Sequence, residues 1–352
     1  MNHPSCPHLD LRSRQVLRTL ITRHIETGDA VGSQTLAKQA QLEVSSATIR
    51  NILADLEELG LLSAPHTSSG RVPTPKGYRF YVDALLQVSP VSAAERLEVA
   101  RTLGESGTTS QRLGCASDLL SSLSQFAGVV SLPKRDRMAF KHVEFVGLEP
   151  TRVLAVVVFA DNSVQNRVID LPVPIQPDEL VEISNFLNQE LAGRSLAELR
   201  RRMLRELRQA QDELQNLMTD SIRLAESALD PIAEDMLVSG QNRLLGTPGL
   251  TDMTRLRELF DAFNSKREIL QLLERTEQAE GVQIFIGEEC GAQPLNNVSV
   301  ISAPYCDADG QVLGVLGVIG PQRMDYSRIV PVVQTTAAVL GESLAGHATS
   351  RP

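Results

Sequence analysis

Arg50 and Asn51 stand side by side in the stretch "SSATIRNILADLEELG", residues 45–60, and both side chains suit the recognition of a base edge. A guanidinium can bond guanine through two hydrogen bonds, and a carboxamide can do the same for adenine. The residues just before them are small enough to allow close approach to a base pair: Ser46, Ala47 and Thr48. This combination predicts a surface that reads DNA, although any small helical unit also needs an ordinary polar face.

The same stretch has the pattern of one amphipathic helix. Its apolar residues recur at helical spacing and form a stripe: Ile49, Ile52, Leu53, Leu56 and Leu59. Ser45 or Ser46 can cap the start, and Gly60 can end the helix. Arg50 and Asn51 lie opposite the stripe, in the half of the helix that precedes its acidic residues. Because those acidic residues repel phosphate, only the first half suits insertion into a major groove.

Two further helices are predicted ahead of this one. Apolar residues recur at helical spacing over residues 12–28, and again over the shorter segment 32–40. Four residues then separate the second helix from the capped one. Helix, short turn and capped helix are the arrangement of a helix-turn-helix unit that binds DNA.

A dense group of turn formers follows in "SAPHTSSGRVPTPKGYRFY", residues 63–81. So much Gly and Pro predicts two short strands joined by a polar hairpin, placed as the wing of a winged helix. Side chains suited to phosphate or a minor groove gather at the tip: His66, Thr67, Ser68 and Arg71. Lys76 and Arg79 add positive charge where the hairpin returns to the domain. The alternative is a solvated connector with incidental charge.

The net charge of −9 would repel DNA if it were spread evenly along the chain. Residues 1–82 hold nine Lys and Arg against seven Asp and Glu, so they carry +2 and the remainder carries −11. We therefore expect any contact with DNA to be confined to the N-terminal module.

Two segments resemble a known family, the HrcA heat-inducible transcription repressors. "SSATIRNILADLEELGLLSAPHTSSGRVPTPKGYRFYVD", residues 45–83, closely resembles the N-terminal domain of that family, and "LGVLGVIGPQRMDYSRIVPVV", residues 313–333, resembles its C-terminal motif. The resemblance implies a homodimeric repressor that binds an inverted-repeat operator in double-stranded DNA upstream of chaperone operons. It also implies modulation by the chaperonin, and a GAF-like domain interrupted by a dimerising insertion.

The remaining sequence alternates between helix and strand patterns. Two amphipathic helices are predicted at 93–105 and 119–132, with strands at 141–149, 152–161 and 163–171. A helical region follows from Asp178 to Asp230, whose near-heptad seam packs either on its own sheet or on another protein. Strand patterns return at 281–287, 296–305 and 311–320, with helices at 252–279 and 325–345.

These patterns, together with the resemblance, predict an α+β multidomain chain. We expect a winged helix-turn-helix domain in residues 1–82 and the two parts of a GAF-like α/β domain in 83–172 and 247–352. A mainly helical dimerising insertion is expected in 173–246.

The sequence lacks the motifs of an enzyme. No nucleophile elbow, phosphate loop or paired-carboxylate motif is visible, and Gly314, Gly317 and Gly320 fit a buried strand better than a dinucleotide fingerprint. We expect no catalytic residue and no cofactor. The alternatives are a winged-helix transcription factor whose GAF-like domain senses a metabolite, and an enzyme with an accessory DNA-binding domain.

Several features predict a cytoplasmic protein with no membrane partner. The four cysteines form no C-x-x-C pair, which fits a reducing cytosol. No secretion leader is visible, and no apolar run is long enough to span a bilayer. His3, Cys6 and His8 lie together near the N-terminus, either as metal ligands or as part of a Pro-rich tail.

Overall fold

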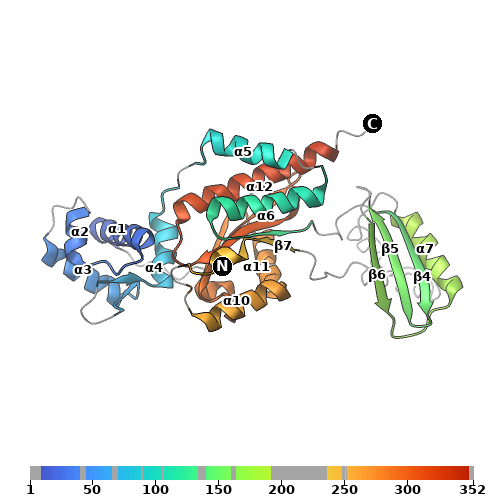
Figure 1. Ribbon diagram of the computed structural model, residues 1–352, viewed down its shortest axis with the longest axis horizontal. Coiled ribbons are helices and arrows are strands. Elements are labelled where there is room, and N and C mark those ends of the chain that lie inside the picture. Colours follow the sequence, from blue (N-terminus) through green and yellow to red (C-terminus); the bar gives the residue numbers. More distant parts are fainter. Residues whose placement is uncertain are drawn as a thin grey trace, which may run out of the picture. The chain divides into compact units, whose positions relative to one another are not determined.

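The computed structural model describes residues 9–39, 45–65, 70–88, 90–104, 107–133, 140–159, 164–191, 236–247, 250 and 252–348. The chain forms two compact units (Figure 1). The first unit comprises Met1–Leu132 and Met236–Pro352, and the second comprises Pro133–Asp235.

The first unit begins with a winged helix. Its helices are α1 (Leu11–Thr27), α2 (Ser33–Gln39) and α3 (Ser46–Glu58). Their facing apolar side chains are buried: Val16, Leu17, Leu20, Ile21, Leu36, Ile49, Leu53 and Leu56. Strands β1 (Leu62–Ser63) and β2 (Val72–Pro73) pair in the antiparallel sense. The predicted helices and the two short strands of the wing are therefore confirmed.

The wing continues into the body of the unit through two helical segments, α4 (Pro75–Phe80) and the π-helical turn η1 (Tyr81–Leu85). Tyr78 is buried, and its ring centroid lies 6.1 Å from that of Tyr326. The buried residues of the winged helix belong to the same hydrophobic cluster as Tyr326 and the residues around it. The winged helix and the body thus share one core.

The body is built on a five-stranded antiparallel sheet with the order β7-β3-β10-β9-β8. The strands are β3 (Ala127–Ser131), β7 (Met236–Ser239), β8 (Gln283–Ile286), β9 (Val298–Cys306) and β10 (Val312–Pro321). The last three were predicted from their apolar runs, and Gly314, Gly317 and Gly320 lie in β10 as expected.

Helices cover both faces of this sheet (Figure 1). One face carries α6 (Thr109–Ser124) and α12 (Tyr326–Ala348), with α5 (Ala93–Gly104) packed on both helices. The other face carries α10 (Met253–Ser265) and α11 (Arg267–Glu277). Three short 3-10 turns lie between these elements: η3 (Gln241–Leu244), η4 (Gly287–Cys290) and η5 (Gln293–Leu295).

The helix predicted over residues 119–132 is only half right. α6 ends at Ser124, Gln125 takes a left-handed conformation (φ 64°), and Ala127–Ser131 form strand β3 between β7 and β10. The apolar residues continue across this boundary at a spacing that either structure accepts, so periodicity alone could not place the end of the helix.

The second unit has its own sheet and core. Strands β4 (Phe140–Glu149), β5 (Arg152–Phe159) and β6 (Val164–Asp170) form a three-stranded antiparallel sheet with β5 in the centre. Helix α7 (Pro177–Leu191) packs on β4, and Leu180, Ile183 and Leu187 are buried in the unit's hydrophobic cluster.

The expected domain boundaries need correction here. Strands β4 to β6 were assigned to the first part of a GAF-like domain ending at residue 172, but they pair only with one another among the described strands. The interruption of the first unit therefore runs from Pro133 to Asp235 rather than from 173 to 246. The predicted helical seam, from Leu199 to Ala228, lies outside the described residues.

Candidate nucleic-acid interface

Helix α3 begins with a well-formed cap. The Ser45 hydroxyl accepts a hydrogen bond from the Thr48 amide at 3.2 Å, which satisfies one of the unpaired amides at the start of the helix. The other free amides and the helix dipole give this end a partial positive charge. Ser46, Ala47 and Thr48 are all exposed there.

Arg50 and Asn51 are also exposed, whereas Ile49 between Thr48 and Arg50 is fully buried. Within the described part of the chain, neither the Arg50 nor the Asn51 side chain has a hydrogen-bond or ion-pair partner. The arrangement expected from helical spacing is thus present: two side chains able to bond base edges lie on the outer face of a capped helix.

The wing is tied closely to the rest of the winged helix. Arg71 and Val31 exchange two backbone hydrogen bonds, each 2.9 Å long, so Val31 extends the β1–β2 ladder by one bridge. The Thr74 hydroxyl donates to the Gly60 carbonyl oxygen at 2.7 Å. His66, Thr67 and Ser68, predicted at the tip of the wing, lie outside the described residues.

The Arg71 side chain joins the wing to α3. Its Nε donates to Glu57 Oε2 at 2.8 Å, and about a quarter to a third of each side chain is exposed (27% and 35%). The sequence predicts Arg71 at the hairpin tip, where its guanidinium can reach phosphate or a minor groove. It also presents Glu57 only as a charge that repels phosphate. In the structure these two side chains form one ion pair, which no local pattern indicates.

The two cations that follow the wing have partners inside the protein. Lys76 Nζ donates to the Leu59 carbonyl oxygen at 2.9 Å, and so satisfies a free carbonyl at the end of α3. Arg79 forms a paired ion bridge with Glu289 of the body, and its Nη1 donates to Asp83 at 3.2 Å. The structure assigns Arg79 an internal role instead of the expected contact with DNA.

The protonation of Arg79 reflects these partners. Burial by itself would lower the pKa of the guanidinium, but hydrogen bonding to Glu289 and the charges of Glu289 and Asp83 outweigh that effect and raise it. Arg79 thus stays charged inside the protein.

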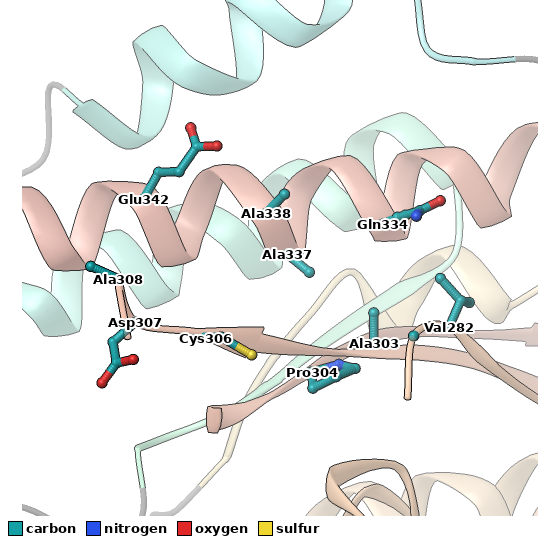
Figure 2. Close-up of a pocket in the computed structure, with 11 residues that line it drawn as sticks. Val282, Ala303, Pro304, Cys306, Asp307, Ala308, Gln334, Ala337, Ala338 and Glu342 are labelled. Atoms are coloured by element: carbon teal, nitrogen blue, oxygen red, sulfur yellow. The ribbon is translucent and has the colours of Figure 1, made fainter. Parts of the chain in front are cut away.

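A separate groove lies in the body, between α12 and the end of β9 (Figure 2). It has a volume of about 630 Å³. Most of the lining is small or apolar, as Figure 2 shows for Ala337 and Ala338 on the helix and for Ala303 and Pro304 on the strand. Two carboxylates, Asp307 and Glu342, lie at one end, and none of the described residues that line the groove is aromatic.

The described residues contain no cluster of three or more His, Cys, Asp or Glu that could hold a metal ion. His3, Cys6 and His8 lie outside those residues. In the part of the chain that the structure describes, no helix is both long enough and apolar enough to cross a membrane.

Two family profiles match the chain. One, "Winged helix-turn-helix transcription repressor, HrcA DNA-binding", covers residues 8–84, and the other, "HrcA protein C terminal domain", covers residues 110–330. The chain belongs to the HrcA family. HrcA proteins are transcription repressors, so the expectation of a DNA-binding regulator rather than an enzyme is confirmed.

Named HrcA relatives match along nearly the whole chain. "Heat-inducible transcription repressor HrcA" of Xanthomonas euvesicatoria pv. vesicatoria (strain 85-10) is 56% identical over 350 residues, which cover 99% of this chain and 100% of the relative. The protein of the same name from Xylella fastidiosa (strain M23) is 54% identical over 341 residues, covering 96% and 97%. A crystal structure described as that of "a hypothetical protein" shares the fold, with a TM-score of 0.60 at 24% identity over 96% of this chain and 99% of that chain.

Proposed function

We propose that this HrcA-family protein represses chaperone operons by binding an inverted-repeat operator as a homodimer in the cytoplasm, and that the chaperonin modulates its activity. The body is proposed to be GAF-like, with the second unit as its dimerising insertion. The observation that carries the DNA-binding part is the exposed pair Arg50 and Asn51 on a capped helix, whose side chains have no partner among the described residues. Ser46, Ala47 and Thr48 complete the base-reading face.

The wing contributes affinity rather than base specificity in this proposal. Arg71, together with His66, Thr67 and Ser68 at the tip, is proposed to contact the DNA backbone, because phosphate contacts raise affinity and carry little base information. Lys76 is included only as a nearby charge, since its Nζ already donates to Leu59. Arg79 is left out because its guanidinium is bound to Glu289.

The test is binding to the DNA upstream of the chaperone operons, measured by footprinting and then by selection from randomised sites. Arg50→Ala and Asn51→Ala should each weaken binding by about 1–3 kcal/mol and relax base preference at one position in each half-site. Arg257→Ala is the matched control, because Arg257 is an exposed arginine on α10 of the body. Unchanged base preference in both α3 variants would remove this helix from the reading role.

A second candidate is a repressor that senses a metabolite, and the groove between α12 and β9 is the observation that favours it. Its volume suits a small molecule, although ligand pockets usually include aromatic side chains. Thermal unfolding separates the two candidates. If added chaperonin raises the Tm and no added metabolite does, the first candidate is supported. If a metabolite raises the Tm and chaperonin does not, the second is supported.

A further inference from the structure

Arginines cross the boundary between the winged helix and the body in both directions. Arg79 on α4 reaches into the body, where it meets Glu289 on η4. Arg323, which lies between β10 and α12, reaches the other way and meets the end of α1. The partners are separated by more than 200 positions in the sequence, so these are tertiary contacts rather than local ones.

The Arg79 contact has well-defined geometry. Its Nε donates to Glu289 Oε1 at 2.9 Å, its Nη2 donates to Oε2 of the same carboxylate, and Nη2 also reaches the Ile284 carbonyl oxygen. Glu289 is itself held by the Ile286 amide at 2.9 Å. A paired arginine–carboxylate bridge constrains direction as well as distance. α4 is therefore fixed in orientation against the edge strand β8.

The Arg323 contact holds a second point of the winged helix, the end of α1. Its Nη1 lies 3.1 Å from the Ile25 carbonyl oxygen and 3.3 Å from that of His24, in the last turn of α1, where the His24 carbonyl oxygen also accepts the Gly28 amide at 2.8 Å. A side chain on Gly28 would place Cβ 2.7 Å from this nitrogen, and Gly28 already has a left-handed φ of 78°. Only glycine fits both the turn and the arginine at this point.

We propose that Arg79, Glu289 and Arg323 are positioning residues for operator binding, which form a clamp that sets the direction of the recognition helix relative to the body. The inference rests on the proposed dimeric function. If two bodies are joined in a dimer, the distance and angle between the two α3 helices depend on how rigidly each winged helix is held. Since half-sites of an inverted repeat must match that geometry, the clamp determines which half-site spacing is accepted.

A clamp that sets the direction of the winged helix has different expected effects on DNA binding from contacts that only stabilise the fold. Loosening it leaves the base-reading face of each winged helix intact, so affinity for a single half-site should not change. The gain in affinity for a correctly spaced pair of half-sites over a single half-site should fall, because a mobile winged helix is no longer held at the distance and angle that the pair requires.

The experiment compares the intact protein with Arg79→Ala, Arg323→Ala and the double variant. Affinity is measured for a single half-site and for inverted repeats whose spacing is changed one base pair at a time. We expect half-site affinity within about twofold of the intact protein, a loss of at least tenfold at the best spacing in the double variant, and a flatter dependence on spacing. Arg79→Lys and Arg323→Lys, which keep a donor, should recover part of the preference, and Arg257→Ala should change nothing.

Circular dichroism shows whether each variant is folded, and the lysine variants carry the test if an alanine variant is not. An intact protein that binds the inverted repeat no better than a half-site would overturn the dimeric operator proposal, and this inference with it. An intact protein with a clear spacing preference that every clamp variant retains would overturn the clamp alone.

Discussion

The ion pair between Arg71 and Glu57 makes a quantitative prediction about the wing. If Arg71 binds a DNA phosphate, its guanidinium must give up the ion pair with the Glu57 carboxylate. Both side chains are partly exposed, and ion pairs of this kind contribute at most about 1 kcal/mol. Loss of the ion pair with Glu57 therefore costs no more than about a fivefold factor in affinity.

Two substitutions test this exchange from opposite sides. Arg71→Ala removes the cation, and should weaken binding to operator and to scrambled DNA by similar factors, because a phosphate contact is blind to sequence. The slope of log affinity against log salt should fall by about one unit, the value for one neutralised phosphate. Glu57→Gln releases Arg71 from this ion pair, and should strengthen binding to both DNAs by up to about fivefold.

A variant that carries both Arg71→Ala and Glu57→Gln distinguishes the release of Arg71 from the simple loss of a negative charge near DNA. If release matters, Glu57→Gln should strengthen binding less in the Arg71→Ala background than in the intact protein. The assay is fluorescence anisotropy with labelled operator and scrambled duplexes across a salt series, with Arg257→Ala as the charge-matched control. Arg71→Ala with both affinities and the slope unchanged would show that the wing does not contact DNA. Preferential loss of A·T-rich sites would indicate insertion into the minor groove instead.

Three further outcomes are expected. Gly77→Ala should lower the free energy of unfolding by about 3 kcal/mol, because the added Cβ would lie 2.1 Å from the Leu61 carbonyl oxygen. Gly114→Ala, on an open helical face, should raise the free energy of unfolding by up to about 1 kcal/mol. Urea unfolding followed by circular dichroism measures both changes. Burial, with the nearby Arg323 charge, lowers the pKa of His24, so its contribution to stability should be lost as pH falls below about 6.5, and His24→Gln should show a weaker pH dependence. Sedimentation of the intact chain should show a dimer; a monomer that still binds the operator tightly would contradict the proposal.

Local signals predicted the winged helix well. The cap at Ser45, the apolar stripe of α3 and the density of Gly and Pro after it are each contained within a few residues, and each corresponds to the element expected. The exposure of Arg50 and Asn51 followed from helical spacing alone. The family resemblance supplied what spacing could not, namely that the chain belongs to a group of repressors.

Features that depend on distant partners could not be predicted. Alternating apolar residues identified β4, β5 and β6 as strands, but such a pattern does not state which sheet a strand joins. They were therefore assigned to the wrong unit. Arg79 looked like a cation for DNA because Glu289, its partner, lies 210 positions away. A charged residue beside a Gly-rich turn has the same local appearance whether it binds phosphate or another part of its own chain.

The way the second unit joins the first has a consequence for engineering and evolution. The chain leaves the first sheet at the end of β3 and re-enters it at the start of β7, where Ser131 lies opposite Met236 in an antiparallel ladder. Residues 133–235 thus replace what could be the tight turn of an ordinary hairpin. Exchanging them for a short Asn-Gly turn would shorten the loop to be closed on folding, which favours the first unit by about 3 kcal/mol of chain entropy. The second unit could then be removed, or exchanged for a foreign domain, without cutting the core that holds the winged helix.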